Sequence, residues 1–440
     1  MYDNKAVSEA ENAVPVFVID EKILDKASNR RMKWLLKNLR SLKDDYRDIG
    51  SDLIVKQGDP VSVIGQMVES YDADRVLFNK SYTPTGRDRD EQFKDELSGH
   101  AVVESFHDRV LHTPESIYTN KGTPYSVFTY YHKKWKKREK EEPMNVGGFQ
   151  DLDEEDNIPN VTDLGFEPVS IELPEAGTDV ARKKLRSFCS EDIEEYSDSR
   201  DYPSEDGTSR LSAYMSYGVI GIREVWEETD GKESASEFQE QLAWRDFYTQ
   251  VLYHNPSVVT ENYKSYEQPI QWENDEELFE KWKNGNTGYP IVDAGMRQLK
   301  QEGYMHNRVR MIVASFLTKD LLIDWRWGYN WFRNMLIDHD VANNNGGWQW
   351  AASTGTDAQP YFRIFNPMSQ GERYDPKAKY IKKYVPELQG VEPELIHSWN
   401  ELSEEERNEA TDYPSPVIKH SERREQALSM YKTARGESED

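Results

Sequence analysis

The sequence of 440 residues contains one cysteine, Cys189, and no long uninterrupted apolar run. A single cysteine excludes an internal disulfide, which suits a reducing compartment. A membrane-spanning helix needs about 18 consecutive apolar residues, and no stretch reaches that length. The start of the sequence also lacks the pattern of a secretory signal. We therefore expect a cytoplasmic protein that has no membrane partner.

Basic residues are scarce as well. The chain has 55 Lys and Arg against 81 Asp and Glu, which gives a net charge of -26. The acidic residues are spread along most of the chain, and this distribution indicates adaptation to high salt, as in a halophile, more than it indicates one basic partner. The length exceeds what one hydrophobic core usually spans, so we expect two domains.

The first part of the chain alternates between two hydrophobic periods. Short β-branched runs are typical of buried strands, and the segments between them have helical spacing. This alternation predicts an α/β domain with a doubly wound parallel sheet over residues 1–131. No strand-like run precedes the first of these segments, so the sheet is expected to lack its first strand. The predicted strands lie within 14–19, 51–60, 74–79 and 99–106, and the predicted helices within 29–46 and 60–72.

Residues 132–180 are predicted to be an acidic interdomain linker. The stretch 141–180 contains 12 acidic residues, four prolines and no Lys or Arg. The run "HKKWKKREK" at 132–140, with six basic residues, precedes it. This run is either a phosphate-facing patch or a solvated helix end, and we favour the solvated helix end because short charged runs usually face water. From 181 to 435 the hydrophobic periods are helical, which predicts a larger all-α domain.

The sign of the charge reverses between residues 281 and 380. This window has 13 Lys and Arg against 9 Asp and Glu, and it holds six of the 12 tryptophans. Basic charge with interleaved aromatic residues suits a nucleotide or nucleic-acid site, because arginine binds phosphate and aromatic rings stack on bases. A helical core with buried Arg–Asp pairs is the alternative interpretation.

Several long motifs within 181–435 resemble the FAD-binding domain of the photolyase/cryptochrome family, closest to class I cyclobutane pyrimidine dimer photolyases. These are "GTSRLSAYMSYGVIGIREV" (207–225), "TGYPIVDAGMRQL" (287–299), "MHNRVRMIVASFLTKDLLIDWRWG" (305–328) and "DHDVANNNGGWQW" (338–350). The N-terminal part resembles the antenna domain of that family less closely. In the family an arginine-bearing strand precedes the pair that matches Asp3-Asn4, and no such strand is present here.

The resemblance implies FAD as cofactor, bound in a folded conformation. It places hydroxyl and backbone groups on the pyrophosphate, an ion pair of Arg310 with Asp338 against the flavin, and a neutral amide, Asn344, near flavin N5. The cofactor-binding residues it implies are Tyr196, Thr208, Ser209, Arg210, Leu211, Ser212, Phe238, Gln241, Arg245, Asn307, Arg310, Asp338, Asp340 and Asn344. No metal is implied.

The resemblance also implies the chemistry of a lyase. Photoexcited reduced FAD passes an electron to a cyclobutane dimer in UV-damaged DNA, the ring opens, and the electron returns. Trp348, Trp325 and Trp272 match a relay that photoreduces the flavin, and with Asn344 they are the predicted catalytic residues. Trp244 and Trp350 match two aromatic walls that receive the flipped dimer. The predicted lesion-binding residues are Arg200, Gln241, Trp244, Asn307, Arg308, Met311, Trp350 and Arg363.

Gln241 departs from the family pattern, which has a glutamate at this position. A glutamine can still donate a hydrogen bond to a thymine carbonyl, but it cannot supply a proton. Two readings stay open: a repair enzyme, which we favour, and a cryptochrome-like blue-light receptor that photoreduces FAD without repair. The protein is expected to be a monomer. The antenna chromophore stays open between a folate, a deazaflavin and none.

Overall fold

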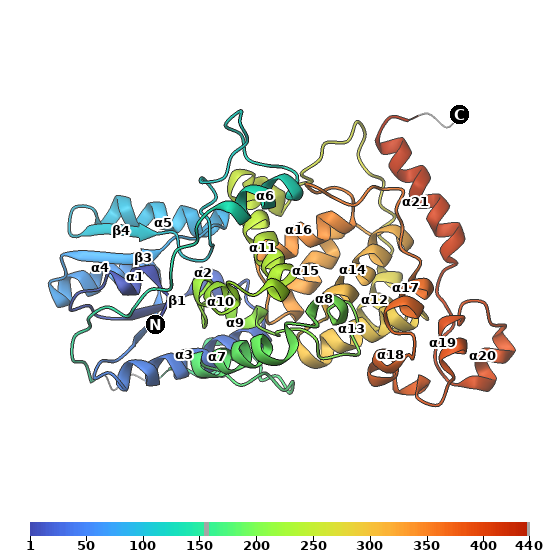
Figure 1. The fold of residues 1–440 in the computed structure, drawn as a ribbon, viewed down its shortest axis with the longest axis horizontal. Helices are drawn as coiled ribbons and strands as arrows, with labels where there is room; N and C mark the ends of the chain where they lie inside the picture. The colour runs from blue at the N-terminus through green and yellow to red at the C-terminus, as the bar shows by residue number, and fades with distance from the viewer. Residues whose placement is uncertain (154–157, 438–440) are drawn as a thin grey trace. The chain divides into compact units, whose positions relative to one another are not determined.

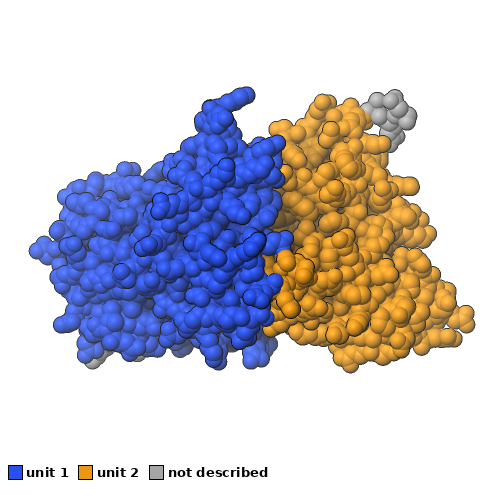
Figure 2. Space-filling model, in the orientation of Figure 1, with its two compact units in different colours: residues 1–194, 209–256, 337–342 blue, residues 195–208, 257–336, 343–440 orange. Residues whose placement is uncertain are grey.

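The computed structural model describes residues 1–153 and 158–437, which form two compact units. Unit 1 contains residues 1–194, 209–256 and 337–342, and unit 2 contains 195–208, 257–336 and the chain from 343 onward (Figure 2). No helix in the described part of the chain combines the length and the apolar character that a membrane span requires.

Unit 1 carries the predicted α/β pattern, with four strands that form two parallel pairs (Figure 1). In one pair Val16 of β1 lies opposite Ile54 of β2, and in the other Arg75 of β3 lies opposite Val102 of β4. Each pair forms its own two-stranded sheet among the described residues. The strands are β1 (Val16–Asp20), β2 (Ile54–Gly58), β3 (Arg75–Asn79) and β4 (Val102–Phe106).

Helices cover these strands in the order that the sequence predicts. The predicted helix at 29–46 is α3, which Ser28 caps by accepting a hydrogen bond from the Arg31 amide. Its buried residues Met32, Leu36 and Leu39 form a core with β1 and β2, because they recur at helical spacing on one face. The helices of unit 1 are α1 (Lys5–Ser8), α2 (Glu21–Leu24), α3 (Asn29–Arg47), α4 (Pro60–Tyr71), α5 (Pro84–Leu97), α6 (Phe128–Lys137), η1 (Thr162–Leu164), α7 (Thr178–Ser187), the π-helix η2 (Phe188–Asp192), α9 (Ser212–Ser216), α10 (Ile222–Thr229), η3 (Glu233–Ala235) and α11 (Ser236–His254).

The described part of the acidic linker lies along α3, which supplies the cations that the linker lacks. Lys33 Nζ donates to the carbonyl oxygens of Val169 at 2.9 Å and Ile171 at 3.2 Å, and Lys37 Nζ donates to that of Pro174 at 3.1 Å. The linker is therefore bound to unit 1 as a surface segment. The basic run at 132–140 lies largely in α6, where Lys133, Lys136, Lys137 and Arg138 are exposed.

Unit 2 is helical, as predicted, and is built around one large core of apolar and aromatic residues. Its centre is α13, which packs against α12, α14, α17 and α18. The helices are α8 (Tyr196–Ser199), η4 (Pro256–Val259), α12 (Glu276–Asn284), α13 (Pro290–Glu302), α14 (Asn307–Ser315), the π-helix η5 (Phe316–Asp320), α15 (Trp325–Met335), α16 (Val341–Ala351), α17 (Pro367–Tyr374), α18 (Lys379–Tyr384), η6 (Pro386–Leu388), α19 (Pro393–His397), α20 (Glu404–Ala410) and α21 (His420–Ala434). Two of these, η4 and α16, begin in unit 1.

Candidate active site

In unit 1, the segment before α9 brings predicted cofactor residues to a buried aspartate. Arg210 has φ 52°, a left-handed backbone that turns the chain into α9. The first residue of that helix, Ser212, donates from Oγ to Asp338 Oδ2 at 2.7 Å, and Ser216 Oγ donates to the Asp338 carbonyl at 3.0 Å. Asp338 is 6% exposed, so its position is fixed by two hydroxyl groups of one helix.

A charged group lies in the same unit. Arg109 contacts Asp340, with Nη2 3.4 Å from Oδ2, and Arg245 donates to the Arg109 carbonyl. Burial and the neighbouring Arg109 guanidinium lower the pKa of Arg245. The carboxylates of Asp340 and Asp246 oppose this shift, so the two guanidinium groups lie beside two acidic side chains.

Trp244, a predicted lesion wall on α11, is held by a stack of rings from α6. Phe128 lies parallel to it at a centroid distance of 3.7 Å and an angle of 9°. His132 stacks on Phe128 at 5.3 Å. A face covered this closely cannot receive another ring, so only the opposite face of Trp244 is left for a base.

Two further predicted residues on α11 have contacts within unit 1. Phe238 is 5% exposed and packs on Phe188 at 4.9 Å, which makes it part of the core. Gln241 donates from Nε2 to the carbonyl of Glu237, one turn earlier, at 3.2 Å. The Gln241 NH2 group has two hydrogens, so its second N–H can donate to a substrate while this bond stays in place.

In unit 2, α8 and the chain after it hold three predicted residues. Tyr196 is buried and has the Arg200 guanidinium 5.3 Å from its ring centre. Thr208 is partly buried. Ser199 Oγ is buried and has no hydrogen-bond partner among the described residues, so a polar ligand group beside Tyr196 would satisfy it.

Helix α14 carries four predicted residues that have different surroundings. Asn307 and Met311 lie one turn apart on the same face, with Nδ2 3.8 Å from Sδ, and Asn307 is exposed. Arg308 forms an ion pair with Asp201 at 2.5 Å, so its charge is already engaged. Arg310 Nε donates to the Met305 carbonyl at 2.7 Å. The predicted pair of Arg310 with Asp338 stays a prediction.

Trp348 and Trp350 both lie on α16. Residues two apart on a helix point roughly 200° apart, so the two indoles lie on opposite sides of α16. Trp348 is 2% exposed within the core, whereas Trp350 is partly exposed and faces Phe365 at 6.4 Å. The three asparagines before them, which taken alone read as a loop, are helical. Asn344 Nδ2 donates to the Tyr329 carbonyl at 3.2 Å.

The three predicted relay tryptophans all belong to unit 2. Trp325 is fully buried and donates from Nε1 to Asn262 at 2.9 Å, and Trp272 is partly buried against Tyr431 at 6.1 Å. Trp348 also contacts Trp282, with centroids 6.1 Å apart. Trp282 is not among the predicted relay residues, and nothing in its local sequence pattern distinguishes it from other core tryptophans.

The last predicted residue, Arg363, is exposed on the loop after α16. The buried amine of Lys319 donates to the Arg363 carbonyl at 3.1 Å and so fixes the loop there. Among the described residues, no group of His, Cys, Asp and Glu could hold a metal ion.

Comparison with known proteins identifies the family. The model for the FAD-binding domain of DNA photolyase matches residues 238–433, and the model for DNA photolyase matches residues 1–147. The chain is 52% identical to the deoxyribodipyrimidine photo-lyase of Halobacterium salinarum, with 96% of this chain and 92% of the relative covered. It therefore belongs to the DNA photolyase family, and its cofactor is FAD.

Solved structures agree on the fold. A class III photolyase from Agrobacterium tumefaciens superposes with a TM-score of 0.92 at 34% identity, covering 99% of this chain and 95% of that one. An archaeal photolyase from Sulfolobus tokodaii, described with two FAD molecules, superposes with a TM-score of 0.86 at 36% identity, covering 98% and 97%. The predicted architecture, an α/β N-terminal part followed by a helical FAD-binding part, is confirmed.

Proposed function

We propose that this protein is a deoxyribodipyrimidine photo-lyase that repairs cyclobutane pyrimidine dimers in DNA under blue light. The observation that carries the proposal is the 52% identity to the Halobacterium salinarum photo-lyase over nearly the whole chain. We further propose that it acts as a monomer in the cytoplasm, and that residues 181–435 form its FAD- and lesion-binding domain.

The residues present fit FAD. Two arginines, Arg109 and Arg245, supply positive charge beside Asp340, and Ser199 Oγ offers a buried hydroxyl without a partner among the described residues. Tyr196, Ser212 and Asp338 would help to hold the cofactor through hydroxyl and carboxylate groups. When bound and reduced, FAD supplies the electron that opens the cyclobutane ring and receives it back, so no net redox change occurs.

The chain's own residues position the lesion and supply electrons. Trp244 would present one ring face to the flipped dimer, because Phe128 covers the other. Asn307 and Met311 would contact the bases from the exposed face of α14. Trp350 would form a second aromatic wall, and Trp348 would pass electrons inward from Trp325 and Trp272. Stacking on aromatic rings favours a damaged step, because it is less costly to unstack than an intact one.

The N-terminal residues 1–131 are proposed to hold a second, light-harvesting chromophore. The Sulfolobus tokodaii protein adds a second FAD to the alternatives, which are a folate, a deazaflavin and no antenna chromophore. The absorption spectrum of the purified protein, before and after the FAD is released, distinguishes these cases.

The test of repair uses an oligonucleotide with one thymine dimer in molar KCl, under blue light and in the dark. Light-dependent reversal is expected in wild type, and Trp244→Ala should weaken dimer binding while flavin photoreduction continues. A wild-type protein that photoreduces its flavin but reverts no dimer would reassign it as a cryptochrome-like receptor.

A further inference from the structure

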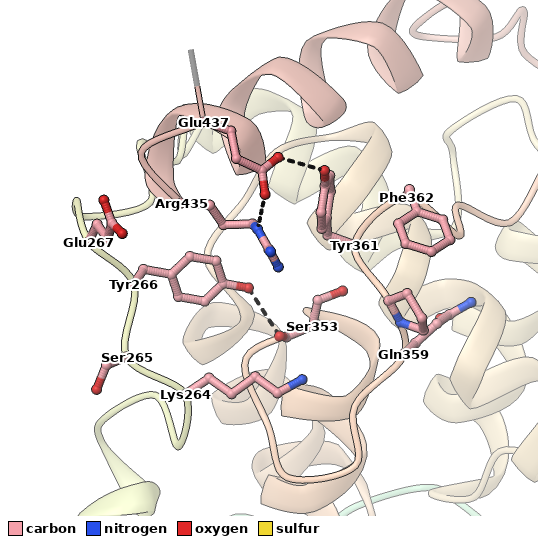
Figure 3. Close-up of a pocket in the computed structure, with 11 residues that line it drawn as sticks. Lys264, Ser265, Tyr266, Glu267, Ser353, Gln359, Tyr361, Phe362, Arg435 and Glu437 are labelled. Atoms are coloured by element: carbon pink, nitrogen blue, oxygen red, sulfur yellow. Dashed lines mark hydrogen bonds and ion pairs between the residues drawn. The ribbon is translucent and has the colours of Figure 1, made fainter. Parts of the chain in front are cut away.

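Unit 2 contains a cavity of about 580 Å³ that the proposed repair steps do not use (Figure 3). Three segments that are distant in sequence form it: residues 264–267, the loop after α16, and the end of α21. The first two are joined by hydrogen bonds, from the Lys264 amide to the Thr354 carbonyl at 2.8 Å and from Tyr266 Oη to the Ser353 carbonyl at 3.1 Å. The volume lies within the range of small-molecule sites, roughly 300–1,000 Å³.

The charges around the cavity balance. The two cations, Lys264 and Arg435, are matched by two carboxylates, those of Glu267 and Glu437. Arg435 Nε lies 2.5 Å from Glu437 Oε1 and forms an ion pair with it. Burial lowers the pKa of Lys264, so the surroundings of the cavity disfavour the charged form of this amine. A neutral ligand fits this balance better than a phosphate does.

Aromatic rings supply stacking surfaces. Tyr266, Tyr361 and Phe362 line the cavity, and the Arg435 guanidinium lies 5.2 Å from the Tyr361 ring centre. Phe362 is 61% exposed, which leaves a large apolar side chain in water at the edge of the cavity. Such surfaces accept planar heterocycles, because every base has a face that can stack.

Two side chains lining the cavity have unsatisfied polar atoms. Ser353 and Gln359 are each 3% exposed, and Ser353 Oγ and both polar atoms of the Gln359 amide lack a hydrogen-bond partner within the described chain. An unpaired buried polar group is destabilising unless a ligand satisfies it. A glutamine amide offers one donor and one acceptor together, which is the pair that reads adenine at N6 and N7.

The cavity lies next to the predicted lesion-binding residues of the same unit. The Ser353 amide donates to the Trp350 carbonyl at 3.3 Å, and Arg363 directly follows Phe362 on the loop. Flipping a thymine dimer leaves two adenines of the opposite strand without partners. We propose that this cavity holds one of those unpaired adenines. The inference rests on the proposed function, because it requires a flipped dimer.

The test compares two duplexes that carry one thymine dimer, with either adenines or abasic sites opposite the dimer. Dissociation constants are measured in the dark by fluorescence anisotropy at fixed salt. Abasic sites also remove the base pairs that flipping must break, so the readout is the ratio of the two dissociation constants, abasic over adenine, compared between wild type and Phe362→Ala. This ratio should be about tenfold higher in wild type, the loss expected from one stacked base. Phe362→Ala should also weaken binding of the adenine duplex. Gln359→Leu should reduce the ratio as well.

A matched control is Leu395→Ala, which removes another exposed apolar side chain of unit 2, 41% exposed and outside the cavity lining. It should retain the full preference for adenine. The same ratio in Phe362→Ala and in a wild type that repairs dimers would overturn the inference and leave the proposed function intact. A wild type that neither binds nor reverts dimers would refute the proposed function, and the inference with it.

Discussion

Gly328 on α15 allows Trp348 to occupy its position, and replacing it tests that packing directly. A Cβ atom at this glycine would lie 2.1 Å from Trp348 Cη2, 2.4 Å from Cζ3 and 2.6 Å from Leu317 Cδ2. Carbon atoms pack at roughly 3.5–4.0 Å, so the indole would have to move by more than an ångström. Phe332 at 5.0 Å and Trp282 at 6.1 Å restrict that movement.

The expected cost follows from two opposing effects. Overpacking a core costs about 1–3 kcal/mol, and a contact this short places Gly328→Ala at the upper end. Alanine in a helix recovers about 1 kcal/mol relative to glycine, which leaves a net loss of about 2 kcal/mol. Urea unfolding followed by tryptophan fluorescence in fixed KCl measures it. Displacement of the indole should also slow flavin photoreduction relative to wild type.

Gly347→Ala is the matched control for stability. It lies in α16, and a Cβ atom there would meet nothing within 4 Å. The substitution should therefore stabilise the protein by about 0.5–1 kcal/mol. If Gly328→Ala were as stable as Gly347→Ala and photoreduced its flavin at the wild-type rate, the proposed role of Gly328 in placing Trp348 would be wrong.

Three further predictions concern single side chains. Trp348→Phe should abolish most flavin photoreduction, since phenylalanine is far harder to oxidise, and loss of the oxidised-flavin absorption band under blue light measures this. Gln241→Glu should raise the fraction of dimers reverted per absorbed photon, because a carboxylic acid can donate a proton that an amide cannot; an unchanged yield would show that the amide suffices. Burial raises the pKa of Asp246 to about 6. The folded protein therefore binds a proton more tightly than the unfolded chain, and stability should fall by up to about 3 kcal/mol as pH rises from about 4 to about 6. Asp246→Asn should remove this slope in melting temperatures measured against pH.

The local pattern predicted the four strands of unit 1 and two of its helices, α3 and α4. The helix at 29–46 follows from apolar spacing, because it buries one face whose period the sequence records. The asparagine run at 343–345 misleads when taken alone, since asparagine favours turns. Tertiary hydrogen bonds prevail there: Asn345 Nδ2 donates to the Val258 carbonyl at 2.6 Å, and Gln349 Nε2 donates to the same oxygen at 2.9 Å.

Sequence patterns did not predict the contacts between distant segments of the chain. The stack of Phe128 on Trp244 joins residues more than a hundred positions apart, and no periodicity in either helix indicates it. The same is true of Trp282 beside Trp348 and of the cavity built from three segments. The resemblance to a family supplied candidate residues and one pair, Arg310 with Asp338, but not the contacts of the other candidates. Only the structure shows that Asp201 already engages Arg308.

The charge of this chain bears on how it could recognise DNA. At molar salt the Debye length falls to about 3 Å, and contacts to phosphate lose much of their affinity. Of two arginines predicted to bind the damaged DNA, Arg308 is paired with Asp201, whereas Arg363 is exposed. Stacking of bases on Trp244 and Trp350 depends far less on salt, because it does not release counterions. The proposed stacking on these two tryptophans would therefore allow a chain with 81 acidic residues to bind a polyanion, provided that the lesion leaves the helix.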